Sequence, residues 1–253
     1  MPDGLTAGGY RLQVDPSVDL WLENCQSLLA SQSQTDLWHL LDEDECTRWR
    51  RFRSPFLRNF FLASHATLRL ILSRYLPNSP AGSLRFSYTD KGRPFLSAEQ
   101  NPQHVDFNLS HSGEWIAVVV GRGCRVGIDL EFMDDKEEEI QSIAERFFHS
   151  EEIHHLSSLT NKQAVLRDFY RLWTAREALY KAYGSGLHEL NATQSFLPIL
   201  ASGRMDCFKN DVCYRLVELN VLPGYAGWVA FGPGERHKKS RPWGIASPNP
   251  PAI

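Results

Sequence analysis

Several features that would indicate a membrane, secreted or nucleic-acid-binding protein are missing from this sequence of 253 residues. The longest apolar run, residues 115–120, is far shorter than the roughly 20 residues that a membrane span needs. The N-terminus lacks the basic and then apolar pattern of a signal peptide. A net charge of −3 gives no overall positive field for nucleic acid or an anionic membrane. We therefore expect a cytoplasmic protein that binds neither, in which local cations hold any anionic ligand.

Cysteine is also scarce, and its distribution excludes two further classes. The five cysteines are odd in number and include no Cys-x-x-Cys pair (Cys25, Cys46, Cys124, Cys207 and Cys213). This pattern argues against a disulfide framework and against a zinc ribbon. The sequence has neither a Gly-x-Ser-x-Gly elbow nor a Walker phosphate loop, which fits a reaction in which the protein does not supply the nucleophile.

Helical spacing and strand-like alternation follow one another twice along the chain. Apolar residues recur every three or four positions from residue 42 to 75, where Pro55 is expected to divide two helices. Residues 84–131 alternate as strands do, and residues 115–120 and 126–130 are expected to pair as a hairpin. A second helical region opens with the acidic run 134–139 and includes a strong helix over residues 163–183.

This order of elements predicts a mixed α/β (α+β) protein with two similar halves, residues 1–125 and 126–232. The chain is long enough to bury one large core or two small ones, because it has 42% hydrophobic residues. Gly, Pro, Lys and Arg dominate after residue 232, so residues 233–253 are expected to form a loose tail.

Two acidic residues occur in a strand-like segment. Alternation over residues 126–131 buries Ile128 and Leu130 on one face and projects Asp129 and Glu131 together from the other. Two carboxylates about 4 Å apart repel by roughly 4 kcal/mol at an effective dielectric constant of 20, so a divalent cation or a proton usually compensates them. Hard oxygen ligands favour magnesium. The alternative is an exposed strand end with two solvated acids.

A third acid lies on the helix predicted over residues 163–183. Trp173, Glu177 and Lys181 are four residues apart and share one helical face, so Glu177 has a cation one turn away. In isolation this could be a helix-stabilising Glu–Lys pair, worth about 0.2–0.5 kcal/mol. The choice between that pair and a functional cluster depends on the surrounding motifs.

A series of short motifs runs through residues 45–190 in a specific order. The longer motifs are FNLSHS at 107–112, GIDLE at 127–131 and FYxxWxxREAxxK at 169–181, and the shorter ones are RRF at 50–52, KGRP at 91–94 and FFxxEE at 147–152. Each motif alone is common. In their order and spacing they resemble the Sfp-type (surfactin-synthetase-activating type) 4′-phosphopantetheinyl transferases.

The resemblance implies a monomer of two pseudo-symmetric halves of the 4′-phosphopantetheinyl transferase fold, with coenzyme A and magnesium in the cleft between them. It implies that Asp129, Glu131 and Glu177 are the metal ligands. It also implies that a larger set of residues binds coenzyme A: Ser110 and His111 at its phosphates, Lys181 at the pyrophosphate, Lys91 and Arg93 as further cations, Arg48 and Arg51 at the nucleotide end, and Arg176 beside Glu177.

The implied reaction is attack by a serine hydroxyl of an acyl or peptidyl carrier protein on the β-phosphorus of coenzyme A. This holo-[acyl-carrier-protein] synthase reaction converts the apo carrier to its holo form and releases adenosine 3′,5′-bisphosphate. Glu177, Lys181 and Asp129 are the implied catalytic residues, with Glu177, or a hydroxide that it orients, accepting the serine proton. By the same resemblance, the carrier protein docks after Glu131, around Met133.

Two residues depart from the family pattern and leave other functions open. Arg176 stands where the family usually has lysine, and Phe60 stands where a basic residue usually meets the nucleotide. These departures suit a non-catalytic coenzyme A or carrier-binding module of the same fold. A metal-dependent phosphoesterase is a second alternative and predicts coenzyme A hydrolysis without a protein acceptor. Zinc binding by histidines is disfavoured, because spacings of five and six do not share one helical face (His149, His154 and His155).

Overall fold

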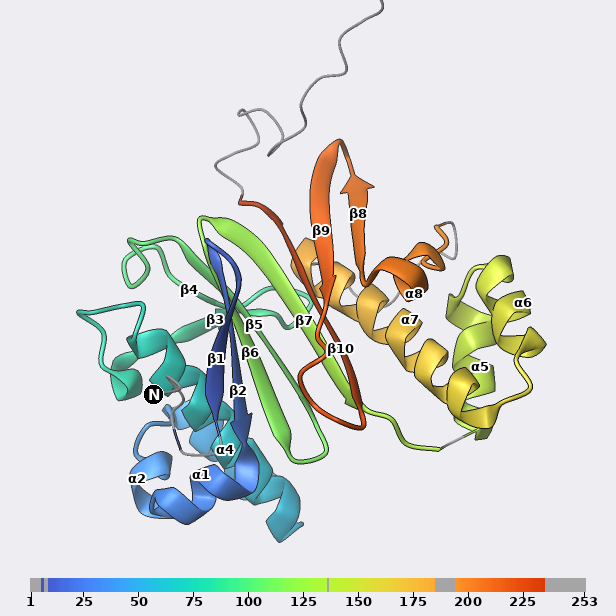
Figure 1. The fold of residues 1–253 in the computed structure, drawn as a ribbon. Helices are drawn as coiled ribbons and strands as arrows, with labels where there is room; N and C mark the ends of the chain where they lie inside the picture. The colour runs from blue at the N-terminus through green and yellow to red at the C-terminus, as the bar shows by residue number, and fades with distance from the viewer. Residues whose placement is uncertain (1–5, 7–8, 136, 185–193, 235–253) are drawn as a thin grey trace, which may run out of the picture.

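Two four-stranded antiparallel sheets form the centre of the computed structural model, which describes residues 6, 9–135, 137–184 and 194–234 (Figure 1). The N-terminal sheet has the order β1 (Tyr10–Asp15), β2 (Val18–Asn24), β6 (Trp115–Arg122), β5 (Val105–Ser112). The C-terminal sheet has the order β7 (Cys124–Phe132), β10 (Tyr225–Pro233), β9 (Val212–Glu218), β8 (Arg204–Lys209). A short hairpin, β3 (Phe86–Tyr88) and β4 (Pro94–Leu96), forms a separate two-stranded sheet.

The helices fall into two groups, one for each sheet. The first group is α1 (Cys25–Ser31), α2 (Gln34–Trp38), α3 (Glu43–Arg51), α4 (Pro55–Ser73) and the 3₁₀ turn η1 (Ala81–Ser83). The second group is α5 (Glu137–Phe147), α6 (Ser150–Ser158), α7 (Lys162–Tyr183) and α8 (Pro198–Ser202). The mixed α+β class in two halves is therefore confirmed, and Pro55 separates two helices as predicted by standing at the start of α4 after the N-cap Ser54.

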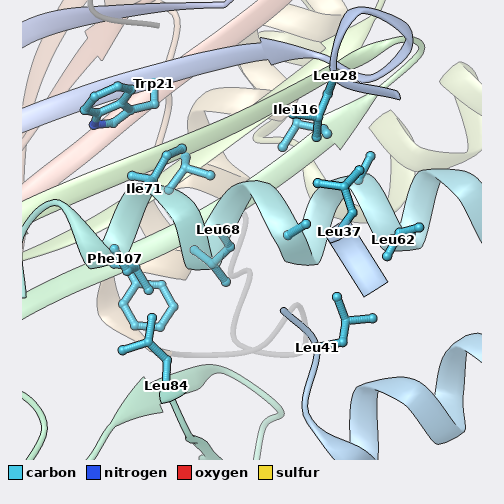
Figure 2. Packing of buried hydrophobic residues seen from close by; sticks show 14 of the residues in the cluster. Trp21, Leu28, Leu37, Leu41, Leu62, Leu68, Ile71, Leu84, Phe107 and Ile116 are labelled. Carbon is cyan, nitrogen blue, oxygen red and sulfur yellow. The ribbon is translucent and has the colours of Figure 1, made fainter. Parts of the chain in front are cut away.

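Three apolar clusters explain why the elements pack in layers. The first lies between the N-terminal sheet and its helices, and Figure 2 shows Leu62, Leu68 and Ile71 of α4 in this cluster with Trp21 and Ile116 of the sheet. The second lies between α5–α8 and the C-terminal sheet, and the third combines side chains of both sheets. Because burying one large apolar side chain contributes about 1.5–3 kcal/mol, these clusters hold the helices on their sheets.

The predicted hairpin of residues 115–120 with 126–130 is wrong. Strand β6 pairs with β2 on one edge and β5 on the other, so neither edge remains for β7, which pairs instead with β10. The turn at Gly123 (φ 69°) thus passes the chain from one sheet to the other. Periodicity identified both strands, but strand pairing depends on distant segments that local sequence does not reveal.

Strands β5 and β7 nevertheless run side by side, joined by side chains instead of a backbone ladder. Four alternate side chains of β5 accept hydrogen bonds from four alternate backbone N–H groups of β7 at 2.9, 2.9, 3.2 and 2.9 Å: Asp106 from Val126, Asn108 from Ile128, Ser110 from Leu130 and Ser112 from Phe132. We call this set of four contacts the seam. The seam joins the two sheets along one line.

The ends of the chain add little to this picture. The division near residue 125 stays a prediction, and residues 235–253, where most of the loose tail is predicted, lie outside the described residues. Over the part of the chain that the structure describes, no helix combines the length and the apolar character that crossing a membrane requires.

Candidate active site

The close approach of α7 to β7 creates the candidate site. A Cβ atom on Gly127 would lie 2.2 Å from the backbone oxygen of Ala178 and 2.4 Å from the backbone nitrogen of Ala182. Only glycine therefore permits this helix-to-strand spacing. The α7 residues that face the strand are fully buried alanines, which lets Glu177 and Lys181 on the same helix come beside the strand carboxylates.

Asp129 is the most buried acid of the cluster. The predicted alternation is confirmed, since Ile128 and Leu130 are buried in the cluster between the sheets while Asp129 faces α7. Its Oδ1 accepts hydrogen bonds from Lys181 Nζ at 2.6 Å and from the Ser110 hydroxyl at 3.1 Å. Its Oδ2 is buried and has no hydrogen-bond partner among the described residues. One half of this carboxylate is thus held in place and the other half is left for a further ligand.

Glu177 is a carboxylate in an unfavourable electrostatic environment. Burial and the charge of Asp129 raise the pKa of Glu177 to about 7, Glu131 adds to this effect, and Lys181 opposes it. Its Oε1 is also buried, and the part of the chain that the structure describes offers it no hydrogen-bond partner. Burial alone would lower the pKa of Lys181, but the adjacent Asp129 raises it, so Lys181 stays cationic. The site therefore combines a firmly charged ammonium with a carboxylate that titrates near neutral pH.

The donor set fits a hard divalent cation. The unpartnered carboxylate oxygens of Asp129 and Glu177 and the nearby carboxylate of Glu131 are the ligand type that magnesium prefers. Among the described residues, no three acidic, histidine or cysteine side chains are already arranged as a metal-binding cluster. Instead, the Lys181 ammonium compensates Asp129. The magnesium ligand set accordingly stays a prediction.

His111 borders the cluster on the side of the N-terminal half. Its exposed ring meets Phe60 edge-on, with ring centroids 4.9 Å apart, and Phe56 stacks on Phe60. Desolvation by neighbouring atoms and the positive charge of Lys181 hold the pKa of His111 below its ordinary value. His111 is therefore a neutral hydrogen-bonding group at the edge of the site at pH 7. Phe60, which departs from the family pattern, packs against it.

Two arginines that the resemblance assigns to coenzyme A have other partners in the structure, which argues against that assignment. Arg93 is largely buried and donates to Asp106 at 2.8 Å, to the backbone oxygens of Phe107 and Val126 at 3.1 and 2.9 Å, and to the backbone oxygen of Lys181. Its bonds join the hairpin β3–β4 to both sheets and to α7. The Arg93 Nη groups that make these bonds are not free for a phosphate, whereas its Nε is buried and has no hydrogen-bond partner among the described residues.

Arg176 faces the interior instead of the site. The residue is 1% exposed, and its side chain forms an ion pair with Glu152 and lies over the rings of Phe148 and Phe196 at 4.6 and 4.5 Å. Neighbouring helix positions differ by about 100°, so Arg176 points away from the direction of Glu177. It is an anchor for α6 and for the segment at Phe196, and these contacts argue against a role of Arg176 at coenzyme A.

The remaining predicted residues are spread more widely. Ser110 uses its hydroxyl within the seam and toward Asp129, so a phosphate contact would have to displace a bond that it already makes. Arg48 is exposed and lies over the ring of Phe61 at 5.4 Å, and Arg51 and Lys91 are exposed. The roles of Arg48, Arg51 and Lys91 at the nucleotide stay predictions.

Sequence reasoning overlooked Ser112, Asn108 and Asp106. Ser112 donates to Glu131 Oε2 at 2.8 Å as well as accepting from β7. A signal was available, because polar residues occupy every second position of β5 although the strand lies inside the molecule. Alternating polar residues at a buried position require hydrogen-bond partners from another element.

Comparison with known proteins agrees with the motif series. Residues 125–216 match the 4′-phosphopantetheinyl transferase superfamily, and residues 30–122 match the 4′-phosphopantetheinyl transferase N-terminal family. The chain is 37% identical over 61% of its length to the 4′-phosphopantetheinyl transferase HetI of a Nostoc species, and 31% identical over 58% to a phosphopantetheinyl transferase of a Thraustochytrium species. It is 30% identical over 62% of its length to the 4′-phosphopantetheinyl transferase ffp of Bacillus subtilis.

These alignments cover 64%, 54% and 66% of the relatives' own lengths, so the chain spans somewhat less than two thirds of each curated relative. The two matched families meet at the seam, where the site is formed. With both halves matched and the acidic motifs in place, the chain belongs to the 4′-phosphopantetheinyl transferase superfamily, as a member of the Sfp type.

Proposed function

We propose that this protein transfers the 4′-phosphopantetheine group of coenzyme A to a serine of an acyl or peptidyl carrier protein and releases adenosine 3′,5′-bisphosphate. The observation that supports this most directly is the cluster in which Glu177, with a pKa of about 7, lies beside the Lys181–Asp129 ion pair. The named activities of the relatives support the same reaction. We further propose that it acts as a cytoplasmic monomer, without nucleic acid or membrane.

Asp129, Glu131 and Glu177 are the residues that would hold Mg²⁺, which when bound would offset the charge of the pyrophosphate. Lys181 would donate its N–H groups to the pyrophosphate oxygens as charge builds on them. His111, neutral and exposed at the edge of the site, would donate to a phosphate oxygen. Glu177 would accept the proton of the attacking serine at a carboxylate oxygen, because a base works best when its pKa lies near the operating pH.

The carrier protein would dock on the surface just beyond the end of β7. Phe132 is 47% exposed at the end of the strand that bears Asp129 and Glu131. A groove continues from it toward the start of α7, lined by Phe132, Met133, Ala164, Leu166 and Arg167. Apolar contact should dominate there, so Met133→Glu should raise KM for the carrier and leave KM for coenzyme A unchanged. Unaltered carrier kinetics would remove this surface from the proposal.

The deciding experiment measures the intact mass of an apo carrier protein after incubation with this protein, coenzyme A and Mg²⁺. A gain of one phosphopantetheine group is expected, and it should disappear without metal and with Glu177→Gln. Binding of coenzyme A with no mass gain on several carriers would support a non-catalytic module instead. Hydrolysis of coenzyme A without any carrier would support a phosphoesterase.

A further inference from the structure

The four seam residues of β5 differ in chemistry, and three of them match the β7 side chain beside them. Asp106 faces the cation Arg125 at 3.8 Å. Asn108 accepts from the backbone N–H of Ile128 and lies beside Gly127, a residue without a side chain. Farther along, two serines face the two acids, with Ser110 donating to Asp129 and Ser112 donating to Glu131. A carboxylate of β5 thus lies beside the arginine of β7, and hydroxyl donors of β5 lie beside the carboxylates of β7. Backbone pairing alone would not require this matching.

A hydroxyl suits both tasks at the acidic end because it has one hydrogen to donate and two lone pairs to accept with. The Ser112 oxygen accepts the Phe132 N–H at 2.9 Å while its hydrogen is donated to Glu131 Oε2 at 2.8 Å. The serine is thus anchored to the backbone next to the carboxylate that it binds. Ser110 repeats the arrangement two residues earlier with Leu130 and Asp129.

We propose that Ser112 is a positioning residue for Glu131, and Ser110 for Asp129: each uses the backbone of β7 as a fixed support to orient one carboxylate for the divalent cation. This inference rests on the proposed function, since it assumes that the carboxylates bind a metal. Groups that hydrogen-bond to metal ligands typically change metal affinity by about 10–100-fold when removed. The serines therefore act on the metal through the acids, without touching it.

The test compares Ser112→Thr with Ser112→Val. The two new side chains have nearly the same shape, but valine has a methyl group where threonine has a hydroxyl. Mn²⁺ is titrated into the full chain with coenzyme A, and bound Mn²⁺ is followed by electron paramagnetic resonance against coenzyme A alone. Ser112→Val should weaken Mn²⁺ binding about 10-fold, and Ser112→Thr should bind about as tightly as wild type. Thermal unfolding of each variant shows whether it is folded.

Asn108→Ala is the matched control, because it removes a seam contact with Ile128 but no contact with an acid. It should lower the unfolding temperature and leave the Mn²⁺ affinity unchanged. Equal affinity of Ser112→Val and wild type, or an equal loss with Asn108→Ala, would overturn the inference. Absence of Mn²⁺ binding by wild type would instead overturn the metal role in the proposed function, and this inference with it.

Discussion

The two long helices, α4 and α7, are anchored in the same way, although only α7 contributes charged side chains to the acidic cluster. In each half, a capping-box glutamate at the start of the preceding helix is buried and pairs with an arginine 24 residues later, Glu45 with Arg69 and Glu152 with Arg176. Side chains also cap both long helices, through Ser54 for α4 and Asn161 for α7. The pseudo-symmetry therefore extends to individual ion pairs.

The halves differ at the residue directly after the anchor arginine. After Arg69 comes Leu70, which packs on the apolar cluster, whereas after Arg176 comes Glu177. Helix α4 meets its sheet through large side chains such as Leu68 and Ile71, while α7 meets β7 at Gly127 through alanines. The two halves thus share the same arrangement of helix and sheet, but the acidic cluster forms only where small residues allow α7 to lie close to the carboxylates of β7.

The largest expected effect on kcat comes from replacing the cation that follows the anchor arginine in the C-terminal half, Lys181. Lys181 stands as far beyond Arg176 as Arg74 stands beyond Arg69, and Arg74 lies over the ring of Trp21. Lys181→Met should lower kcat about 100-fold or more, because an electrostatic stabiliser of developing charge is lost. Arg74→Met should change kcat little. Carrier-loading kinetics with both variants would show whether the comparison holds, and similar losses would contradict it.

Removing either anchor arginine should destabilise the fold. Arg176→Met leaves the buried Glu152 without its cation, and Arg69→Met leaves the buried Glu45 with His65 as its remaining partner. Breaking a buried ion pair typically costs about 3–5 kcal/mol in free energy of unfolding. Denaturant unfolding of both variants should show losses of similar size. Any Arg176→Met protein that remains folded should still bind coenzyme A with wild-type affinity, and a selective loss of that affinity would restore Arg176 to the coenzyme site.

Close packing of α7 can be tested at two glycines. Gly127→Ala should cost about 1–3 kcal/mol in free energy of unfolding and reduce kcat, because the new Cβ meets helix backbone that cannot move aside. Gly121→Ala in β6 is the comparison, since its Cβ would meet the side chains of Val126 and Cys124 at 2.6 and 2.8 Å. Gly121→Ala should lower the free energy of unfolding less than Gly127→Ala does, and its kcat should stay nearer to the wild-type value. Equal effects on kcat would argue against a special role of Gly127.

The smallest expected effect is a difference in pH dependence between the halves, measured as Tm in EDTA. Burial alone would raise the pKa of Glu45, but the hydrogen bond from His65 and the charges of His65 and Arg69 lower it. The stabilisation of the fold by ionised Glu45 is therefore present at neutral pH and is lost as the pH falls through the lowered pKa of Glu45. Glu45→Gln should lower Tm at pH 7 and have less effect in acid.

Glu177 should show the opposite sign. Its pKa is raised to about 7, so the folded state favours the protonated form, and stability is lost as the pH rises from the ordinary glutamate range through 7. Glu177→Gln should therefore raise Tm at pH 8 and change it little at pH 4. A Tm difference between wild type and Glu177→Gln that is independent of pH would contradict the raised pKa.

Much of the site could be predicted from local patterns. Alternation placed Asp129 and Glu131 on one face of a strand, and four-residue spacing placed Glu177 and Lys181 on one face of a helix. The orientation of Arg93 and Arg176 could not be predicted in this way, because a long side chain can serve either a surface or an interior anion. Only the positions of Asp106 and Glu152 decide that choice.

The sequence by itself determined the elements, the family resemblance and the residue types of the acidic cluster, because periodicity and motif spacing are local properties of a chain. The tertiary structure decided which strands pair, which arginines are buried and which hydroxyls hold the acids. It also decided that Lys181 compensates Asp129 and that Glu177 titrates near neutral pH. Those outcomes depend on burial and on charges far apart in sequence, which only the folded chain brings together.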